Sequence, residues 1–313
     1  MTGLGRRGAL ALAREGRVAA RGRGPLAGEQ RWALLFLAPT LLGLAVLSAG
    51  PIFGTLAISF TQWDLLQAPK LVGFENFAEL VSDDRFLKAL RNTVFYTVTS
   101  VPIGLAIALG LALALNQTIR GIAWIRTAYF LPVVTSTIAV ALVWQWILSP
   151  DAGLLNQALA AVGIGPRKWL VEPTLIMPSI VAMSIWQGLG TNIIIFLAGL
   201  QAIPTELLDA ASVDGAARWA RFRHVILPLL TPSIFFTGIL SLISSFQVFD
   251  QVFVLARPRP TEASITVVYF IYENGFKFFK MGYASAASWV LLLIVAFFTW
   301  LYFRGQDRWV HYQ

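Results

Sequence analysis

The chain of 313 residues contains no cysteine, only two histidines and few charged side chains. Without cysteine it forms neither disulfides nor thiolate metal sites, and His224 and His311, far apart in sequence, do not suggest a histidine-based metal site. Only 13% of the residues are charged, about half the usual share for a soluble domain, whereas 57% are hydrophobic. A soluble protein this apolar would expose large adhesive patches, so the composition indicates a membrane protein with several spans.

Motifs for nucleotide binding and hydrolysis are also missing. None of the five lysines follows a glycine, as the phosphate loop G-x-x-x-x-G-K-[ST] requires, so this chain is not expected to bind ATP itself. The sequence has no H-E-x-x-H and no G-x-S-x-G motif, and no histidine lies in a long apolar segment. These absences argue against a membrane enzyme such as an acyltransferase or protease. We expect no catalytic residue, no metal and no cofactor bound by this chain.

Six apolar segments are long enough to cross a bilayer, which takes about 20 residues. A basic tail at 1–31 precedes a membrane domain at 32–305, and residues 306–313 follow it. The sequence therefore predicts an all-α polytopic membrane protein with six transmembrane helices. The predicted spans are 32–60, 93–115, 122–148, 173–200, 229–249 and 283–303.

The distribution of basic residues predicts the orientation of these spans. With both termini in the cytoplasm, the inner segments contain fourteen Lys and Arg against six Asp and Glu, whereas the outer loops contain ten of each. The net charge of +8 then lies entirely on the inner face, as the positive-inside rule requires. This is not the pattern of a nucleic-acid-binding surface, so no nucleic-acid partner is expected. The loop at 201–228 is placed in the cytoplasm.

This cytoplasmic loop is the most distinctive polar segment of the chain. Asp209 is expected in a helix that Gly215 breaks, because glycine tolerates a positive φ. Residues 218–225 are predicted to form a second short helix. Pro228 either ends this helix or opens the next segment. A helix lying on the membrane surface is the alternative interpretation, and the loop arginines Arg218, Arg221 and Arg223 could bind lipid headgroups.

The loop resembles the coupling-helix signature, or EAA loop, of ABC importer permeases, with Asp209 where that family usually has Glu. Other segments are similar to sugar-type permeases, among them Phe130-Leu131-Pro132, Trp186-Gln187-Gly188 and Phe249-Asp250. The resemblance covers roughly residues 32–305 and is nearest to the short form of the maltose and glycerol-phosphate branch. The residues that it identifies as coupling to an ATPase are Asp209, Ala210, Ala211, Asp214, Gly215 and Ala216.

The resemblance implies a type I importer permease (MetI-like) in a bacterial inner membrane, surrounded by membrane lipid. It implies three kinds of partner: a second permease subunit in a heterodimer, two ABC ATPase subunits that bind the ATP, and an extracytoplasmic substrate-binding protein. The substrate would be a sugar or polyol derivative. A permease for amino acids or peptides is one alternative. A stand-alone secondary transporter is another, although it would be expected to carry paired intramembrane ionisable residues, which these spans lack near their centres.

Polar residues inside the spans are candidates for substrate contact, because such residues in membranes are functional by default. Gln187 and Thr191 share one helix face, as do the fifth-span serines; helix–helix packing is the alternative use of such residues. No Lys or Arg lies in the middle of a span, which argues against a phosphate contact. Asp250 lies at the outer end of the fifth span. The candidate cavity residues are Trp186, Gln187, Gly188, Thr191, Asn192, Ser241, Ser244, Ser245 and Gln247; by resemblance, Gln187, Gly188, Thr191, Ser241, Ser244 and Ser245 match lining positions in maltose-type relatives.

Overall fold

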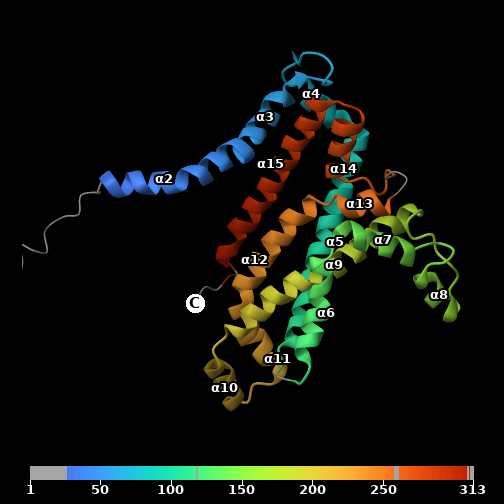
Figure 1. Cartoon of the computed structure of the whole chain (residues 1–313). Coiled ribbons are helices and arrows are strands. Elements are labelled where there is room, and N and C mark those ends of the chain that lie inside the picture. Colours follow the sequence, from blue (N-terminus) through green and yellow to red (C-terminus); the bar gives the residue numbers. More distant parts are fainter. Residues whose placement is uncertain (1–26, 118, 257–260, 309, 311–313) are drawn as a thin grey trace, which may run out of the picture. The chain divides into compact units, whose positions relative to one another are not determined.

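The computed structural model describes residues 27–117, 119–256, 261–308 and 310 (Figure 1). The structure divides into two compact units, residues 1–55 and 56–313, and each is described by itself. Most of the basic tail predicted at 1–31 lies outside the described residues, as do residues 309 and 311–313 of the predicted C-terminal segment.

The described part of the first unit is helical. It consists of α2 (Ala27–Leu44), the π-helical turn η1 (Ala45–Ala49) and the start of α3 (Gly50–Ser59). Together, Trp32–Ser59 form an apolar helix of 28 residues, long enough to cross a membrane. A helix that is apolar on all sides needs lipid or another helix around it, which agrees with the predicted span at 32–60.

The second unit is a bundle of helices with one two-stranded ribbon. In the ribbon, β1 (Thr61–Gln62) pairs antiparallel with β2 (Lys70–Leu71). The helices are α4 Glu75–Ser82, α5 Asp84–Leu115, α6 Ile122–Val134, α7 Thr137–Ile147, α8 Leu154–Ala161, α9 Pro173–Gln201, α10 Thr205–Val213, α11 Arg218–Arg221, η2 Phe222–Ile226, α12 Leu227–Phe246, α13 Asp250–Leu255, α14 Val267–Tyr272, η3 Glu273–Lys277, α15 Met281–Gly305 and η4 Gln306–Arg308.

Five helices in the described chain are long and apolar enough to cross a membrane, and a bent pair makes a sixth candidate. The helix α5 begins at Asp84, nine residues before the predicted span at 93–115. Its start is capped by Asp83, whose carboxylate accepts hydrogen bonds from the backbone N–H groups of Arg85 at 2.8 Å and Phe86 at 3.2 Å. Hydropathy located only the apolar part of this helix, because its first turns are polar.

The predicted span at 122–148 is not one straight helix. The helices α6 and α7 meet at an angle of 101°. Between them, Thr135 has extended backbone angles (φ −87°, ψ 142°) and ends α6, so the i→i−4 ladder is interrupted there. The second half, α7, packs against α13 and α9 instead of continuing along α6.

The predicted short helix at 218–225 is also different in the structure. The segments α11, η2 and α12 follow one another without a break, so Arg218–Phe246 is one helix of 29 residues (Figure 1). Pro228 therefore neither ends a helix nor opens a new one. Before it, the N–H of Leu227 donates to the carbonyl of Phe222 in a π-helical bond, which widens the helix where the proline ring must fit.

Two hydrophobic clusters hold the second unit together, and α9 takes part in both. One cluster includes Phe86 and Phe270 and extends along α9 as far as Met183. The other includes Ala108 and begins on α9 at Leu189. The polar residues Ser184 and Gln187 lie on the stretch of α9 between these clusters.

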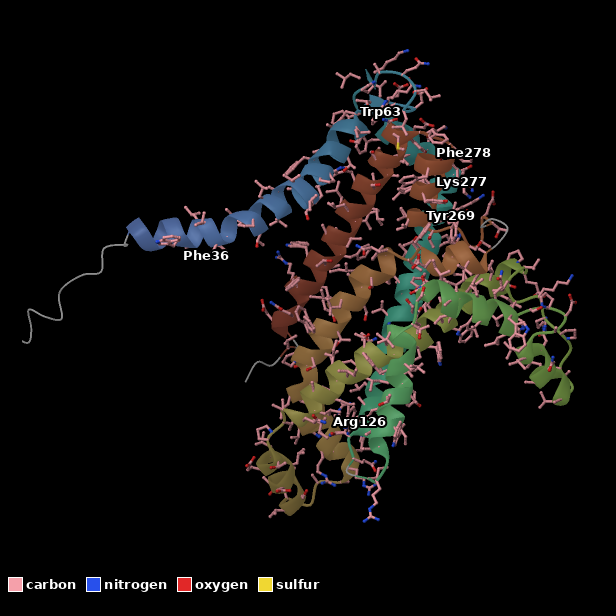
Figure 2. The ribbon with its side chains drawn as sticks, in the orientation of Figure 1. Phe36, Trp63, Arg126, Tyr269, Lys277 and Phe278 are labelled. Atoms are coloured by element: carbon pink, nitrogen blue, oxygen red, sulfur yellow. The ribbon has the colours of Figure 1, made fainter. Side chains whose placement is uncertain are left out.

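Polar contacts secure the end of this unit that contains the start of α5. Arg85 pairs with Glu273, whose side chain is only 3% exposed, and Lys88 pairs with the exposed Glu262 at 2.7 Å. Because Lys88 donates to its carboxylate, the pKa of Glu262 is lowered. Figure 2 shows Tyr269 and Lys277 at this same end and Arg126 at the opposite one; Lys277 donates to the Tyr269 hydroxyl at 2.9 Å.

The loop at 149–172 is organised by one buried side chain, Asn156, which is 6% exposed. Its amide donates to the carbonyls of Pro150 and Arg167, both at 2.9 Å. Its oxygen accepts from the Arg167 N–H at 3.1 Å and from the Trp169 indole at 2.8 Å. This one side chain, in the first turn of α8, thus holds the segment before α8 against the segment after it.

Candidate functional site

The loop at 201–228 contains an exposed helix with a well-formed C-terminal cap. After α10, Gly215 has a φ of +72°, as the sequence predicts. The N–H of Ala216 donates to Ala211 O at 2.9 Å and that of Gly215 to Ser212 O at 3.1 Å. This pair of bonds is the Schellman motif, which satisfies the last carbonyls of a helix and requires a left-handed residue. The turn that follows α10 is therefore fixed by its own backbone.

The six residues of the predicted coupling motif lie together on this helix and turn. Asp209, Ala210, Asp214 and Gly215 are exposed, and Ala211 and Ala216 are half-buried. No residue of α10 is fully buried. Arg221 donates to the Ser212 hydroxyl at 2.8 Å and so connects α10 to the start of the long α11–α12 helix.

Large apolar side chains are exposed around the same turn. Leu207 is 45% exposed, Val213 88% and Trp219 68%. The neighbouring Asp209 and Asp214 are charged, so this is not a surface suited to hydrocarbon. An apolar patch edged by charged residues is typical of a protein-binding surface.

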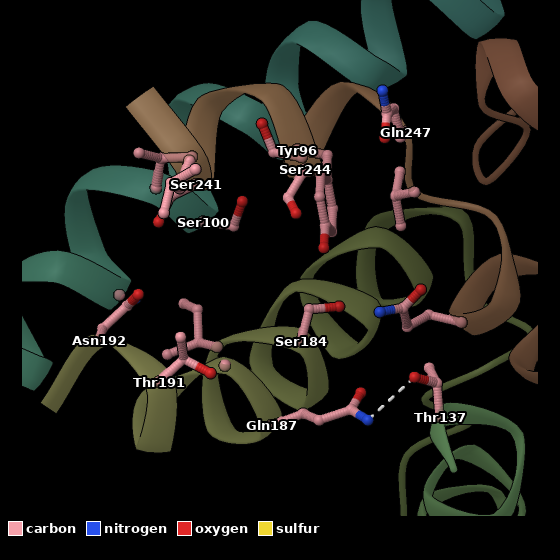
Figure 3. Close-up of a pocket in the computed structure, with 18 of the residues that line it drawn as sticks. Tyr96, Ser100, Thr137, Ser184, Gln187, Thr191, Asn192, Ser241, Ser244 and Gln247 are labelled. Carbon is pink, nitrogen blue, oxygen red and sulfur yellow. Dashed lines mark hydrogen bonds between the residues drawn. The ribbon is translucent and has the colours of Figure 1, made fainter. Parts of the chain in front are cut away.

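A polar pocket of about 460 Å³ lies between α5, α9 and α12, with contributions from α6, α7 and the start of α13. In Figure 3, Ser241 and Ser244 of α12 face Ser184 and Thr191 of α9 across this pocket. Eight of the nine candidate cavity residues line it: Gln187, Gly188, Thr191, Asn192, Ser241, Ser244, Ser245 and Gln247.

Several polar side chains in this pocket have no protein partner in the described part of the chain. Gln187 donates to Thr137 Oγ1 at 3.1 Å, and Ser245 donates to Thr97 Oγ1 at 3.0 Å. In contrast, Thr191, Asn192, Ser241, Ser244 and Gln247 make no side-chain hydrogen bond to the described residues. Groups that are left available in a pocket can bond a hydroxyl-rich ligand or water.

Trp186 is the one candidate that the structure does not bring to this pocket. Its ring lies 5.8 Å from that of Trp144, edge to face, beside a separate apolar cavity of about 510 Å³. Successive helix residues point about 100° apart, so Trp186 and Gln187 face different sides of α9. Trp186 therefore belongs to the packing between α9 and α7.

Sequence reasoning missed several residues that line the pocket. Tyr96 and Ser100 come from α5, Thr137 from α7, Ser184 from α9 and Gln251 from the start of α13. Asp250, which the sequence analysis places at the outer end of the fifth span, also lines the pocket. Tyr96 and Ser100 are four residues apart in an apolar helix, which is the same signal that identified Gln187 and Thr191. Thr137 could not be found, because it reaches the pocket only through the bend between α6 and α7.

A close backbone contact sets the distance between α6 and α9 beside the pocket. A Cβ on Gly190 would lie 2.5 Å from Tyr129 O and 3.0 Å from Phe130 Cα. Only glycine allows this approach, which is typical of tightly packed membrane helices.

In the described part of the chain, no group of three His, Cys, Asp or Glu residues is arranged to hold a metal.

Comparisons with known proteins agree with these features. Residues 100–309 match the family model described as binding-protein-dependent transport system inner membrane component. The chain is 37% identical to the probable ABC transporter permease protein YesP of Bacillus subtilis, over 89% of this chain and 91% of that protein. It is 36% identical to the lactose transport system permease protein LacF of Rhizobium radiobacter, over 86% and 92% respectively.

A solved structure shares this architecture over nearly the whole chain. It is a chain of a bacterial alginate ABC transporter in complex with an alginate pentasaccharide-bound periplasmic protein. The two chains superpose with a TM-score of 0.80 at 25% identity, covering 90% of this chain and 96% of the other. The bent α6–α7 pair, the exposed α10 turn and the polar pocket thus occur in a chain similar to transporter subunits.

Proposed function

The chain belongs to the binding-protein-dependent transport system inner membrane components, and from that premise we propose that it carries a sugar or polyol derivative across the membrane through the polar pocket. As a member of this family, it is a multi-pass inner membrane protein and the permease subunit of an ABC importer. It is a transporter component and not an enzyme.

We infer the substrate class from the hydroxyl and amide groups in the pocket that are free to bond a ligand. Hydroxyls and amides that lack protein partners suit a ligand rich in hydroxyl groups, and the pocket volume lies within the range of small-molecule sites. Relatives with named substrates support this choice: one is a lactose permease, one an arabinooligosaccharide permease, and one an sn-glycerol-3-phosphate permease.

The exposed α10 turn is the proposed docking site for an ATPase subunit. Asp209, Ala210, Ala211, Asp214, Gly215 and Ala216 would sit in a cleft on that subunit, together with the exposed Leu207 and Val213. In this proposal ATP binds to two partner ATPase subunits and not to this chain. Both termini lie in the cytoplasm, on the same side as α10, as the distribution of basic residues indicates.

Transport would follow an alternating-access cycle. ATP closes the ATPase dimer, the α10 turn moves with it, and the continuous Arg218–Phe246 helix carries the movement to Ser241 and Ser244 in the pocket. A second permease subunit supplies the other wall of the pathway, and an extracytoplasmic binding protein delivers the substrate. Coupling of this kind needs an element whose two positions both sites can bias, and this helix contacts both.

The Gly215→Pro variant tests the coupling role. Proline cannot adopt a φ of +72° and has no N–H to donate to Ser212, so the Schellman cap is lost. The matched control is Gly163→Pro, since Gly163 also has a positive φ, of +80°, but lies in the loop after α8. Each tagged chain is purified from membranes in mild detergent with its co-expressed partners.

We expect the wild type and Gly163→Pro to bring down the ATPase and a second permease, whereas Gly215→Pro inserts and keeps the permease but loses the ATPase. Substrate-stimulated ATPase activity in the eluate and uptake of labelled sugar into proteoliposomes are then measured. ATPase retention by Gly215→Pro would contradict the docking role of the turn. Uptake of an amino acid or peptide in place of sugar would contradict the proposed substrate class.

A further inference from the structure

The polar pocket contains a single charged side chain. Of the residues that line it, all within the described part of the chain, only Asp250 is ionisable at neutral pH. Asp250 is half-buried and begins α13. Neither of the two ion pairs in the described structure includes it, and its carboxylate makes no side-chain hydrogen bond to the described residues.

No basic residue in the pocket walls offsets this charge. The helices α7, α9 and α12 contain no Lys, Arg, Asp or Glu at all. On α5, Arg91 precedes the pocket residue Tyr96 and lines a different cavity, beside Lys88. On α6, Arg126 lies two turns before Val133 and donates to Leu115 O at 2.8 Å.

We propose that Asp250 makes the pocket selective for uncharged carbohydrates and excludes phosphate esters and uronic acids. This rests on the proposed function, because it concerns the same pocket. An ionised carboxylate has two oxygens that accept hydrogen bonds, so it binds a pair of neighbouring sugar hydroxyls, and such charge-assisted bonds are the stronger kind. An anionic group about 6 Å from it, at an effective dielectric constant of about 20, is disfavoured roughly a hundredfold.

This selectivity divides the substrates named for similar proteins. Lactose and arabinooligosaccharides carry no charge, whereas sn-glycerol 3-phosphate does, and alginate is an acidic polysaccharide. With Asp250 in its pocket, this chain falls in the first group. Its competitor is a local role for Asp250, since an acidic residue in the first turn stabilises a helix such as α13.

Binding to the purified permease–ATPase complex, without its binding protein, separates these roles. The probes are two labelled pools: neutral oligosaccharides from digests of starch, arabinan and galactan, and acidic ones from digests of pectin and alginate together with sn-glycerol 3-phosphate. After equilibrium dialysis, bound species are identified by mass spectrometry, and the ratio of acidic to neutral binding is determined. The variants are Asp250→Asn, Asp250→Glu and, as a control in the same pocket, Ser241→Ala.

The wild type should retain neutral oligosaccharides only. Asp250→Asn should raise the acidic-to-neutral ratio by tenfold or more, Asp250→Glu should keep it low, and Ser241→Ala should weaken binding without changing the ratio. Equal binding of both pools by the wild type, or an unchanged ratio in Asp250→Asn, would contradict the role of Asp250 but not the proposed sugar transport. If no carbohydrate binds to a complex that still contains the ATPase, both the proposed sugar transport and the role of Asp250 are wrong.

Discussion

Replacing Gly190 with alanine tests how tightly α6 and α9 pack beside the pocket. The added methyl would lie 2.5 Å from Tyr129 O, 2.7 Å from Val133 Cγ2 and 3.0 Å from Phe130 Cα. Two of these three atoms belong to the α6 backbone, which cannot rotate away as a side chain can. Reaching the 3.4 Å of ordinary contact requires α6 to retreat by about 0.9 Å.

A matched variant isolates the cost of this movement. Gly188 lies on the same helix, and a Cβ there meets no atom within 4 Å. Both substitutions gain about 0.5–1 kcal/mol, because alanine favours a helix interior over glycine. Forcing extra volume into a packed contact costs about 1–3 kcal/mol. The difference in free energy of unfolding between the two variants should therefore be about 1–3 kcal/mol, with Gly190→Ala the less stable.

Thermal unfolding of the detergent-solubilised complex measures this difference, with substrate binding determined in parallel. Gly188→Ala should unfold no earlier than the wild type and should weaken substrate binding, since its methyl enters the pocket. Gly190→Ala should unfold a few degrees lower. If Gly190→Ala is as stable as Gly188→Ala, the close approach of α6 to α9 does not exist and the packing argument is wrong.

Three further predictions concern other parts of the second unit. Arg85→Met leaves Glu273 buried without its partner and should destabilise the protein by about 3 kcal/mol in thermal unfolding; Lys88→Met, which breaks an exposed pair, should have little effect. Asn156→Ala removes the side chain that organises the loop at 149–172 and should make that loop at least tenfold more sensitive to limited proteolysis, with α5 unaffected. Trp186→Phe, which changes a contact outside the pocket, should alter sugar affinity less than twofold.

Eight of the nine candidate cavity residues, chosen largely from the helical periodicity of polar residues, line one pocket in the structure. Gln187 and Thr191 are one turn apart on α9, as are Ser241 and Ser245 on α12, so each set shares a face. Inside a membrane, such faces are driven toward one another or toward water. Trp186 was grouped with them because an aromatic ring suits either packing or sugar contact. It lines a different cavity in the structure, because adjacent helix residues point about 100° apart.

Other features left little trace in the sequence. The bend between α6 and α7 falls inside a long, mainly apolar run, in which only the short polar stretch Thr135-Ser136-Thr137 lies at the bend. The contact at Gly190 depends on the partner helix, so no local pattern distinguishes it from the open position at Gly188. In contrast, the Gly215 turn was predictable, because its backbone bonds are local and require a residue that tolerates a positive φ.

The uninterrupted helix from Arg218 to Phe246 also has a simple mechanical consequence. Ser241 lies 23 residues from Arg218, which corresponds to about 35 Å along the axis at 1.5 Å per residue. If this helix pivots at Arg218, a tilt of only about 5° displaces the pocket serines by roughly 3 Å. That displacement is as long as a hydrogen bond. A slight rotation at the inner end is therefore enough to make or break every contact that α12 offers a substrate, without any change in the helix itself.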